Sequence, residues 1–367
     1  TEFPLFTFLY GDLHAHAISL PLTQVALGIA LQWGLSRAPK WPARTLPLHL
    51  AAWRFFRQSL PLIVLAGLTA GALQATNTWD YPTYLLLMAA GSLLPLLAPG
   101  AASDASERAE TRFPFYQLAI PVAIGAFSAL LFRPFSANYV AAYGAVEIWR
   151  GRRSLPGEYF LIHGQFIVPL LVLALAQGRV MIQRLRQRLG ESLHTEFLVV
   201  AAGALLLTLT LLFVGVKIAW IVVPLGVIAA LLVLAPEQRP QWRTFWFWVG
   251  TALTITLVVE MFVLKGDLGR MNTVFKPYMQ VWMLFAITAA VAQERVWTFL
   301  WSGKDAADTR FALWASGKRL WLGDVVLSAL LLLLLLSALY PAFAIPAKLQ
   351  DRWVKDAPHT LDGAASL

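Results

Sequence analysis

The sequence contains no cysteine and few charged residues. Of its 367 residues, 13% are Asp, Glu, Lys or Arg and none is Cys. The absence of cysteine excludes disulfide bonds, cysteine-ligated zinc and thiol nucleophiles. A soluble domain has about 25% charged residues, so this chain is too poor in charge to belong to that class. Its apolar segments also lack the period-two alternation of outer-membrane barrel strands.

Apolar residues dominate the chain instead. They make up 58% of it, and its mean hydropathy is +0.64. Continuous apolar stretches of about twenty residues are long enough to cross a bilayer as helices. We therefore expect an all-α fold, a polytopic transmembrane helical bundle of about ten spans. The predicted segments are 14–35, 58–76, 80–98, 116–132, 159–177, 196–214, 218–235, 244–264, 277–293 and 321–343.

The connections between these segments are too short to hold a soluble domain. We therefore expect residues 1–367 to form a single transmembrane domain. The chain begins at Thr1 rather than at a methionine, and it opens directly on an apolar approach to a polar motif. From this we expect it to be the C-terminal part of a longer chain.

Lysine and arginine are concentrated in alternate connections. Most of the 29 Lys and Arg residues lie in five of them, which are cytoplasmic by the positive-inside rule. The same rule accounts for the net charge of +9, so we do not expect nucleic acid as a partner. The prediction is a multi-pass protein of the cell (plasma) membrane whose motif-bearing loops face outside. The five connections are 36–57, 99–115, 178–195, 236–243 and 294–320.

The first polar motif, Gly11–His16, stands directly before an apolar segment. In an extended chain, Asp12, His14 and His16 project to one face, which is a metal-ligand arrangement. In a helix, only Asp12 and His16 would share a face. We interpret Asp12 as a catalytic carboxylate and the three side chains as ligands of a divalent metal ion. In the alternative interpretation, Asp12 caps the helix and orients a histidine.

The second motif, Asn77–Pro82, forms a tight turn between two predicted spans. Asp80 stands two residues before Pro82 and is typical of a helix cap, while Trp79 is typical of the interfacial aromatic belt. The functional alternative is that Asp80 faces Asp12 as a second carboxylate. In that case Asn77 and Asp80 would both contact substrate.

The segment 260–278 carries the densest set of polar residues. Glu260 lies within an apolar span, where an acidic residue is functional or paired. Asp267 is a second candidate for a catalytic base, and Gly266 and Gly269 let backbone amides approach an anion. The alternative is a belt of Lys and Arg beside lipid head groups, which also suits the loop with Arg150, Arg152 and Arg153. The candidate ligands of a phosphate or diphosphate are Arg270, Asn272 and Lys276.

At these motifs the chain resembles the YYY-domain family, uncharacterised polytopic membrane proteins of archaea and green non-sulfur bacteria. Members of that family are usually longer, with further spans before the Glu-Phe-Pro stretch. The resemblance extends over nearly the whole chain. The matching stretches are 2–4, 8–16, 77–82, 162–164 with Phe166, and 267–276.

The layout of that family is similar to the glycosyltransferase C superfamily. Both have many spans, acidic residues in outward loops and basic residues that hold a lipid-linked sugar phosphate. The resemblance implies glycosyl transfer from a polyprenyl-phosphate sugar, with inversion. Asp12 would be the first candidate for the general base and Asp267 the second. Arg270 and Lys276 would stabilise the leaving phosphate.

Two other functions remain open from the sequence. The chain could be a non-enzymatic carrier of a lipid-linked sugar, or an integral subunit of a larger membrane complex with other membrane proteins as partners. The polar face would then bind lipid or a partner, and the histidines would be structural. A metal-dependent hydrolase of a lipid phosphate is the third possibility.

The predicted orientation can be tested by cysteine labelling, because the chain has no cysteine of its own. Single cysteines at Ser136 and Gly266 should react with an impermeant thiol reagent on intact cells. Cysteines at Ala38 and Ala306 should react only after the membrane is opened. Labelling of Gly266 and Ala306 from the same side would contradict this orientation.

Overall fold

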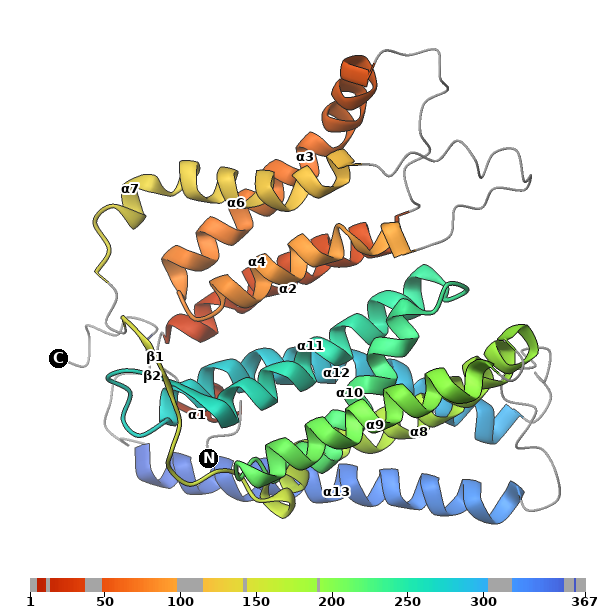
Figure 1. Cartoon of the computed structure of the whole chain (residues 1–367). Coiled ribbons are helices and arrows are strands. Elements are labelled where there is room, and N and C mark those ends of the chain that lie inside the picture. The colour runs from red at the N-terminus through yellow and green to blue at the C-terminus, as the bar shows by residue number, and fades with distance from the viewer. Residues whose placement is uncertain are drawn as a thin grey trace.

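The computed structural model describes residues 5–10, 14–36, 48–97, 115–140, 144–189, 192–302, 319–352 and 360. Figure 1 shows its elements, which are nearly all helices. In chain order they are α1 (Leu5–Tyr10), α2 (Ala15–Leu35), α3 (Leu48–Thr76), α4 (Tyr81–Gly91), η1 (Leu94–Leu97), η2 (Phe115–Leu118), α6 (Ala119–Leu131), α7 (Arg133–Ser136), β1 (Val146–Ile148), α8 (Pro156–Leu189), α9 (Ser192–Phe213), α10 (Ala219–Leu234), α11 (Pro240–Met261), β2 (Phe262–Leu264), α12 (Met271–Ser302) and α13 (Arg319–Arg352).

Every predicted apolar segment coincides with a helix. Among the described residues, seven helices are long and apolar enough to cross a membrane, namely α2, α3, α8, α9, α11, α12 and α13. The remaining predicted segments form α4, α6 and α10, which are shorter. A helix satisfies its own backbone hydrogen bonds, which is what an apolar surrounding requires. The prediction of an all-α, multi-pass membrane protein is confirmed.

The helices form two groups that lie one above the other in Figure 1. In the first group α2, α3, α4 and α6 pack against one another, and in the second α8, α10, α11 and α12 do so. The groups meet where α2 packs on α11. At this contact Gly34 of α2 has no room for a side chain, because a Cβ atom there would overlap Thr244. Small residues allow such close approach between membrane helices.

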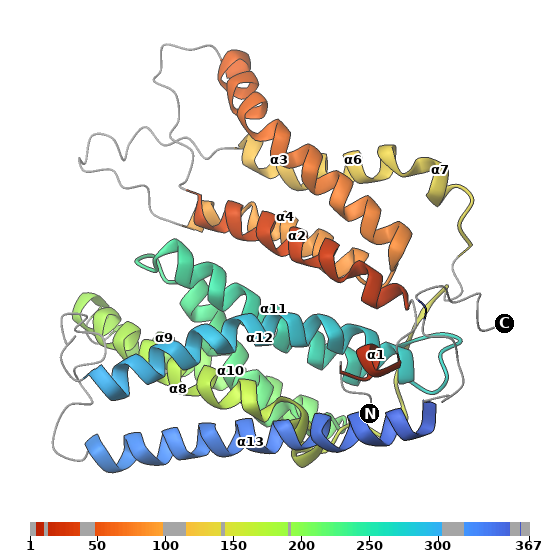
Figure 2. The same ribbon diagram turned by 180° about the vertical axis from the view of Figure 1, so that it is seen from behind.

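Helix α13 lies along the outside of the second group, beside α8 (Figure 2). Only 6% of its most apolar stretch, which lies within residues 327–351, is buried within the protein. Most of its leucine run is therefore exposed in this structure.

Two three-residue strands pair at the end of the second group, directly after α11. Strands β1 and β2 are antiparallel, with Glu147 opposite Val263. The pair continues on both sides, since Trp149 N donates to Met261 O (2.8 Å) and Lys265 N donates to Ala145 O (2.9 Å). The ribbon was not predicted, because strands this short carry no readable periodicity. It fixes the 144–149 segment to the end of α11.

The packing of α3 on α6 gives a stability prediction. A Cβ atom at Gly67 would lie 2.6 Å from Phe127 Cβ and 3.2 Å from the Ser128 backbone nitrogen, so the helices would have to separate. We expect Gly67→Ala to lower the stability by about 1–3 kcal/mol, the usual cost of overpacking. The measurement is the thermal unfolding midpoint of the detergent-solubilised protein.

The matched control is Gly125→Ala, in the middle of α6. A Cβ atom there would meet nothing within 4 Å, so the change should keep or slightly raise the midpoint, because alanine is the better helix former. If both variants unfold at the same temperature, the close α3–α6 packing is wrong.

Candidate functional site

Most of the sequence motifs meet at one end of the bundle. We call residues 14–19, 77–80, 144–155 and 260–280 the motif end. They lie on the left in Figure 1, where α2 and α12 begin and β1 pairs with β2. Ser136 and Gly266 lie within the described residues, whereas Ala38 and Ala306 lie outside them.

Asp80 is buried in the turn before α4 and connects three parts of the chain. Its Oδ2 atom accepts hydrogen bonds from Ser19 Oγ (2.6 Å) and Asn77 Nδ2 (2.9 Å). Its Oδ1 atom accepts one from Gln280 Nε2 (2.9 Å). Asp80 stands at the N-cap position of α4, but its side chain makes no capping hydrogen bond. The carboxylate therefore joins α2, the 77–80 turn and α12 rather than capping a helix.

The two motif histidines differ in exposure. His14 is exposed, while His16 is buried in the first turn of α2. Their ring centroids are 5.0 Å apart, and the His16 ring also lies 5.0 Å from that of Phe275. His16 Nε2 is 2.7 Å from Thr7 Oγ1, a hydrogen bond whose direction depends on the tautomer. The histidine thus joins α1, α2 and α12.

Lys276 lies partly buried beside these groups. Its Nζ atom is 4.9 Å from the centre of the Trp79 ring, within range of a cation–π interaction. Asp80 and Asp267 are near enough to interact with its charge, but it makes no direct ion pair with a carboxylate of the described residues. Its charge is therefore incompletely neutralised, as a phosphate ligand requires.

Asp267 accepts hydrogen bonds at the start of α12. Its Oδ1 atom accepts from Leu268 N (2.8 Å), Asn272 N (3.2 Å) and Asn272 Nδ2 (3.0 Å). Its Oδ2 atom accepts from Thr273 N (2.8 Å) and Thr273 Oγ1 (2.7 Å). Burial raises the pKa of the Asp267 carboxyl, but the hydrogen bonds from Thr273 and Asn272 outweigh burial and hold this pKa below its ordinary value.

These contacts change the interpretation of the glycine-rich turn. Gly266 and Gly269 have φ angles of 91° and 62°, in the region that favours glycine. The backbone amides of Leu268, Asn272 and Thr273 donate to Asp267, so these amides are not free for an external anion. The capped helix begins at Met271, six residues before the predicted segment. The binding role of Asn272 and the catalytic role of Asp267 stay predictions, since both have a structural role here.

Glu260 and Arg270 form an ion pair. The Glu260 side chain has no exposed area, and the Arg270 side chain is mostly buried. Glu260 Oε1 accepts hydrogen bonds from Arg270 Nη1 (2.9 Å) and Ser154 Oγ (2.7 Å), and Oε2 accepts one from Ser154 N (2.9 Å). Arg270 also donates to Val259 O (2.8 Å), and its guanidinium carbon is 5.7 Å from the Trp149 ring centre. Arg270 therefore has an internal partner, which a substrate phosphate would have to share.

Arg153 connects the same region to α9. It donates hydrogen bonds to the backbone oxygens of Glu260 (2.9 Å), Trp149 (2.8 Å) and Val214 (2.5 Å). The sequence does not distinguish it from Arg150 and Arg152, because its role depends on carbonyl groups from distant segments.

His163 lies inside the bundle on α8 and is completely buried. Neither ring nitrogen has a hydrogen-bond partner among the described residues. Its ring centroid lies 4.8 Å from that of Tyr159, 4.9 Å from that of Tyr278 and 5.8 Å from that of Phe285. A buried polar group without a partner is costly and points to a role beyond packing. The sequence marked His163 only as part of a motif.

The predicted metal site depends on Asp12, which lies outside the described residues. Within the described part of the chain, no three His, Asp or Glu side chains could hold a metal ion together. A metal at His16 Nε2 would have to replace the hydrogen bond with Thr7. His14 and His16 therefore fit a metal only if Asp12 completes the set.

The structure brings several predicted site residues together. His16, Asn77, Asp80 and Lys276 lie around the start of α2 and α12, as the preceding contacts show. Sequence reasoning missed Ser19 and Gln280, the buried partners of Asp80. Both are isolated polar residues in or next to apolar segments, a signal that could have identified them.

This architecture defines the class of the protein. It is a multi-pass, α-helical membrane protein with one polar end that is held together by hydrogen bonds and an ion pair. Within that class, the chain belongs to the family described as "Uncharacterized membrane protein (DUF2298)", which matches residues 1–285. This match includes the whole motif end and ends within α12. No curated protein and no solved structure matches the chain. This match confirms the expectation that the chain belongs to a family of uncharacterised membrane proteins.

The Glu260–Arg270 pair gives a prediction about stability. Glu260→Gln would leave Arg270 without its counter-ion. Breaking a buried ion pair costs about 3–5 kcal/mol, so this variant should unfold at a clearly lower temperature in detergent. Part of the loss should be recovered in the double variant Glu260→Gln/Arg270→Gln, which has no unpaired charge.

Glu147→Gln is the matched control at the same end of the molecule. Glu147 is exposed, and its Oε1 atom lies 3.9 Å from Lys265 Nζ. An exposed pair contributes about 1 kcal/mol or less, so this variant should unfold nearly as the wild type does. Equal losses in the Glu260 and Glu147 variants would mean that Glu260 is not buried in a pair.

Proposed function

We propose that the motif end transfers a sugar from a lipid-linked sugar phosphate to an acceptor hydroxyl, in the manner of the glycosyltransferase C superfamily. The observation that carries this proposal is Lys276, a partly buried cation over the Trp79 ring without a direct ion pair among the described residues. Lysine is a common phosphate ligand. An incompletely neutralised lysine at a membrane boundary suits a substrate whose phosphate is attached to lipid.

The proposed donor is a polyprenyl-phosphate sugar, and the motif end faces the outside of the cell membrane. Lys276 binds the donor phosphate. Arg270 adds positive charge while it remains paired with Glu260. Asn77 and Asp80 shape the adjoining wall through their mutual hydrogen bond.

In the proposed reaction, Asp12 removes the proton from the acceptor hydroxyl. The acceptor oxygen forms a bond to the anomeric carbon as the bond from that carbon to the phosphate oxygen breaks. The lipid phosphate leaves with the electron pair, stabilised by Lys276. His14 and His16 hydrogen-bond the phosphate or, with Asp12, hold a divalent metal ion that stabilises its charge.

Asp12 is preferred over the other motif carboxylates because of their contacts. Asp80 is buried and holds three side-chain hydrogen bonds. Asp267 caps α12, and its lowered pKa makes it a weaker base. Asp12 stands two residues before His14, the N-cap residue of α2.

The alternative is a non-enzymatic carrier of lipid-linked sugars, or a subunit of a larger membrane complex. One observation favours it, namely that Asp80, Asp267 and Glu260 are all used to hold the motif end together. A binding protein needs such a rigid polar end but no general base. Metal-dependent hydrolysis of a lipid phosphate would instead require Asp12, His14 and His16 as metal ligands.

The enzymatic proposal is tested by substitutions in the full-length protein. Asp12→Asn keeps the shape of the side chain but removes the base, so the rate of sugar transfer should fall by about a hundredfold or more while the protein still folds. Lys276→Gln should weaken donor binding, whereas Lys265→Gln should not, since Lys265 is exposed and pairs with Glu147. Transfer is measured with common lipid-linked sugars, and three variants, Asp12→Asn, His14→Ala and His16→Ala, are scored for bound metal.

Each outcome separates the alternatives. Full transfer by Asp12→Asn would remove the base assignment from Asp12 and move it to Asp267. Loss of bound metal in the three variants together would identify a metal site. A wild type that binds lipid-linked sugars but transfers none would support the carrier.

A further inference from the structure

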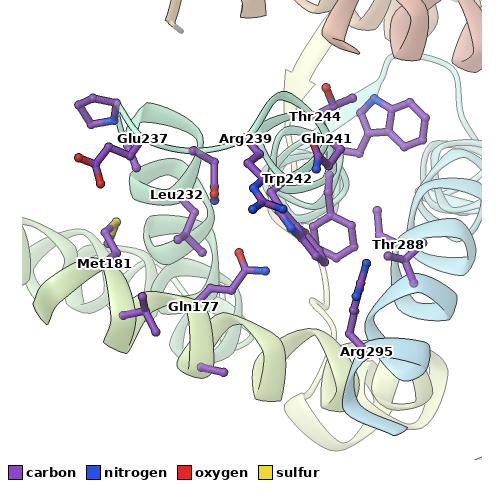
Figure 3. A pocket seen from close by; sticks show the side chains of 18 of the residues that line it. Gln177, Met181, Leu232, Glu237, Arg239, Gln241, Trp242, Thr244, Thr288 and Arg295 are labelled. Atoms are coloured by element: carbon purple, nitrogen blue, oxygen red, sulfur yellow. The ribbon is translucent and has the colours of Figure 1, made fainter. Parts of the chain in front are cut away.

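A cavity of about 590 Å³ lies at the end of the bundle opposite the motif end. It is enclosed by α8, the α10–α11 connection, the start of α11 and the last turns of α12 (Figure 3). Helix α11 has 22 residues and reaches from this cavity to Glu260. At 1.5 Å per residue its ends are roughly 33 Å apart, close to the thickness of a bilayer core. The cavity and the motif end therefore lie at opposite faces of the membrane.

The cavity has an apolar wall and a basic mouth. Its volume is within the usual range of about 300–1,000 Å³ for small-molecule sites. The apolar wall includes Val180, Leu232, Phe245, Ile287 and Val291. The polar groups of the lining include Gln177, Arg184, Glu237, Arg239, Gln241 and Arg295.

Among the described residues, the three arginines of the lining make either an exposed ion pair, which is weak, or none. Arg184 lies 3.6 Å from Glu237, both at the protein surface. Arg295 Nε is 3.4 Å from Glu294, an exposed contact, and its guanidinium carbon lies 5.7 Å from the Trp242 ring centre. Arg239 has no ion pair among the described residues.

Figure 3 shows Arg239 and Arg295 on either side of Trp242 in this view, and all three residues line the cavity. Arg239 is the N-cap residue of α11 and therefore stands at the cavity end of this long helix. The nearby Arg243 plays a different part, because it donates to Val233 O and Ala235 O (both 2.9 Å) and shapes the end of α10.

We infer that this cavity binds an anionic lipid, with its phosphate between Arg239 and Arg295 and its chain against the apolar wall. Arginine forms paired, charge-assisted hydrogen bonds with phosphate oxygens. The connections at this end carry the excess of Lys and Arg that marks the cytoplasmic side, where anionic lipids gather. Free phosphate shares the head-group chemistry but would leave the apolar wall uncovered. This inference does not depend on the reaction proposed at the motif end.

The test is binding of phosphatidylglycerol to the full chain in a neutral detergent, followed by native mass spectrometry. Arg239→Gln/Arg295→Gln should weaken binding by about tenfold or more, because two charge-assisted contacts are lost. The matched control is Arg186→Gln, an exposed arginine of α8 outside the cavity lining. It should leave the affinity unchanged.

Arg239→Gln alone keeps the inference testable if the double variant does not fold. Arg239 makes no ion pair among the described residues, so the change should leave the thermal unfolding midpoint nearly unchanged and weaken lipid binding. Equal phosphatidylglycerol affinity in all variants would overturn the site. Equal affinity for phosphatidylcholine would overturn the need for an anionic lipid. Inorganic phosphate that binds as tightly as the lipid would show a free-anion site instead.

Discussion

The buried ion pair between Glu260 and Arg270 is the interaction on which the motif end depends. Removing a carboxylate from water costs several kcal/mol unless a counter-ion and hydrogen bonds replace the water. Arg270 and Ser154 supply them, and Arg153 binds the Glu260 carbonyl. These residues come from separate segments, so Glu260 is satisfied only when α11, α12 and the 149–155 segment are assembled. The paired strands β1 and β2 hold that segment in position.

The same requirement explains the other carboxylates. Asp80 is surrounded by donors from α2 and α12, and Asp267 by donors from the first turn of α12. Asp80 therefore connects separate pieces of the chain, whereas Asp267 stabilises the start of α12 locally. Lys276 differs, because it meets an aromatic ring instead of a carboxylate. A polar end whose buried carboxylates are hydrogen-bonded internally, and whose Lys276 makes no direct ion pair among the described residues, is suited to an anionic ligand.

Arginine has contrasting roles at the two ends of α11. At the motif end, Arg153 and Arg270 are bound to backbone carbonyls and to Glu260, and they act in the framework. At the opposite end, Arg239 and Arg295 line a cavity. The residue type is the same, and the number of nearby acceptors decides whether its charge is used within the protein or is left for a ligand.

The sequence by itself determined the helices, since the length and hydropathy of an apolar run are local properties. It also identified Glu260 as a residue needing a partner. Only the tertiary structure decided that Arg270 and Ser154 are its partners, because the packing of distant segments brings these side chains together. The same holds for Ser19 and Gln280, the partners of Asp80. The early start of α12 and the arginine-lined cavity could not be predicted for the same reason. Hydropathy records how apolar a segment is, whereas hydrogen-bond partners depend on which helix faces meet.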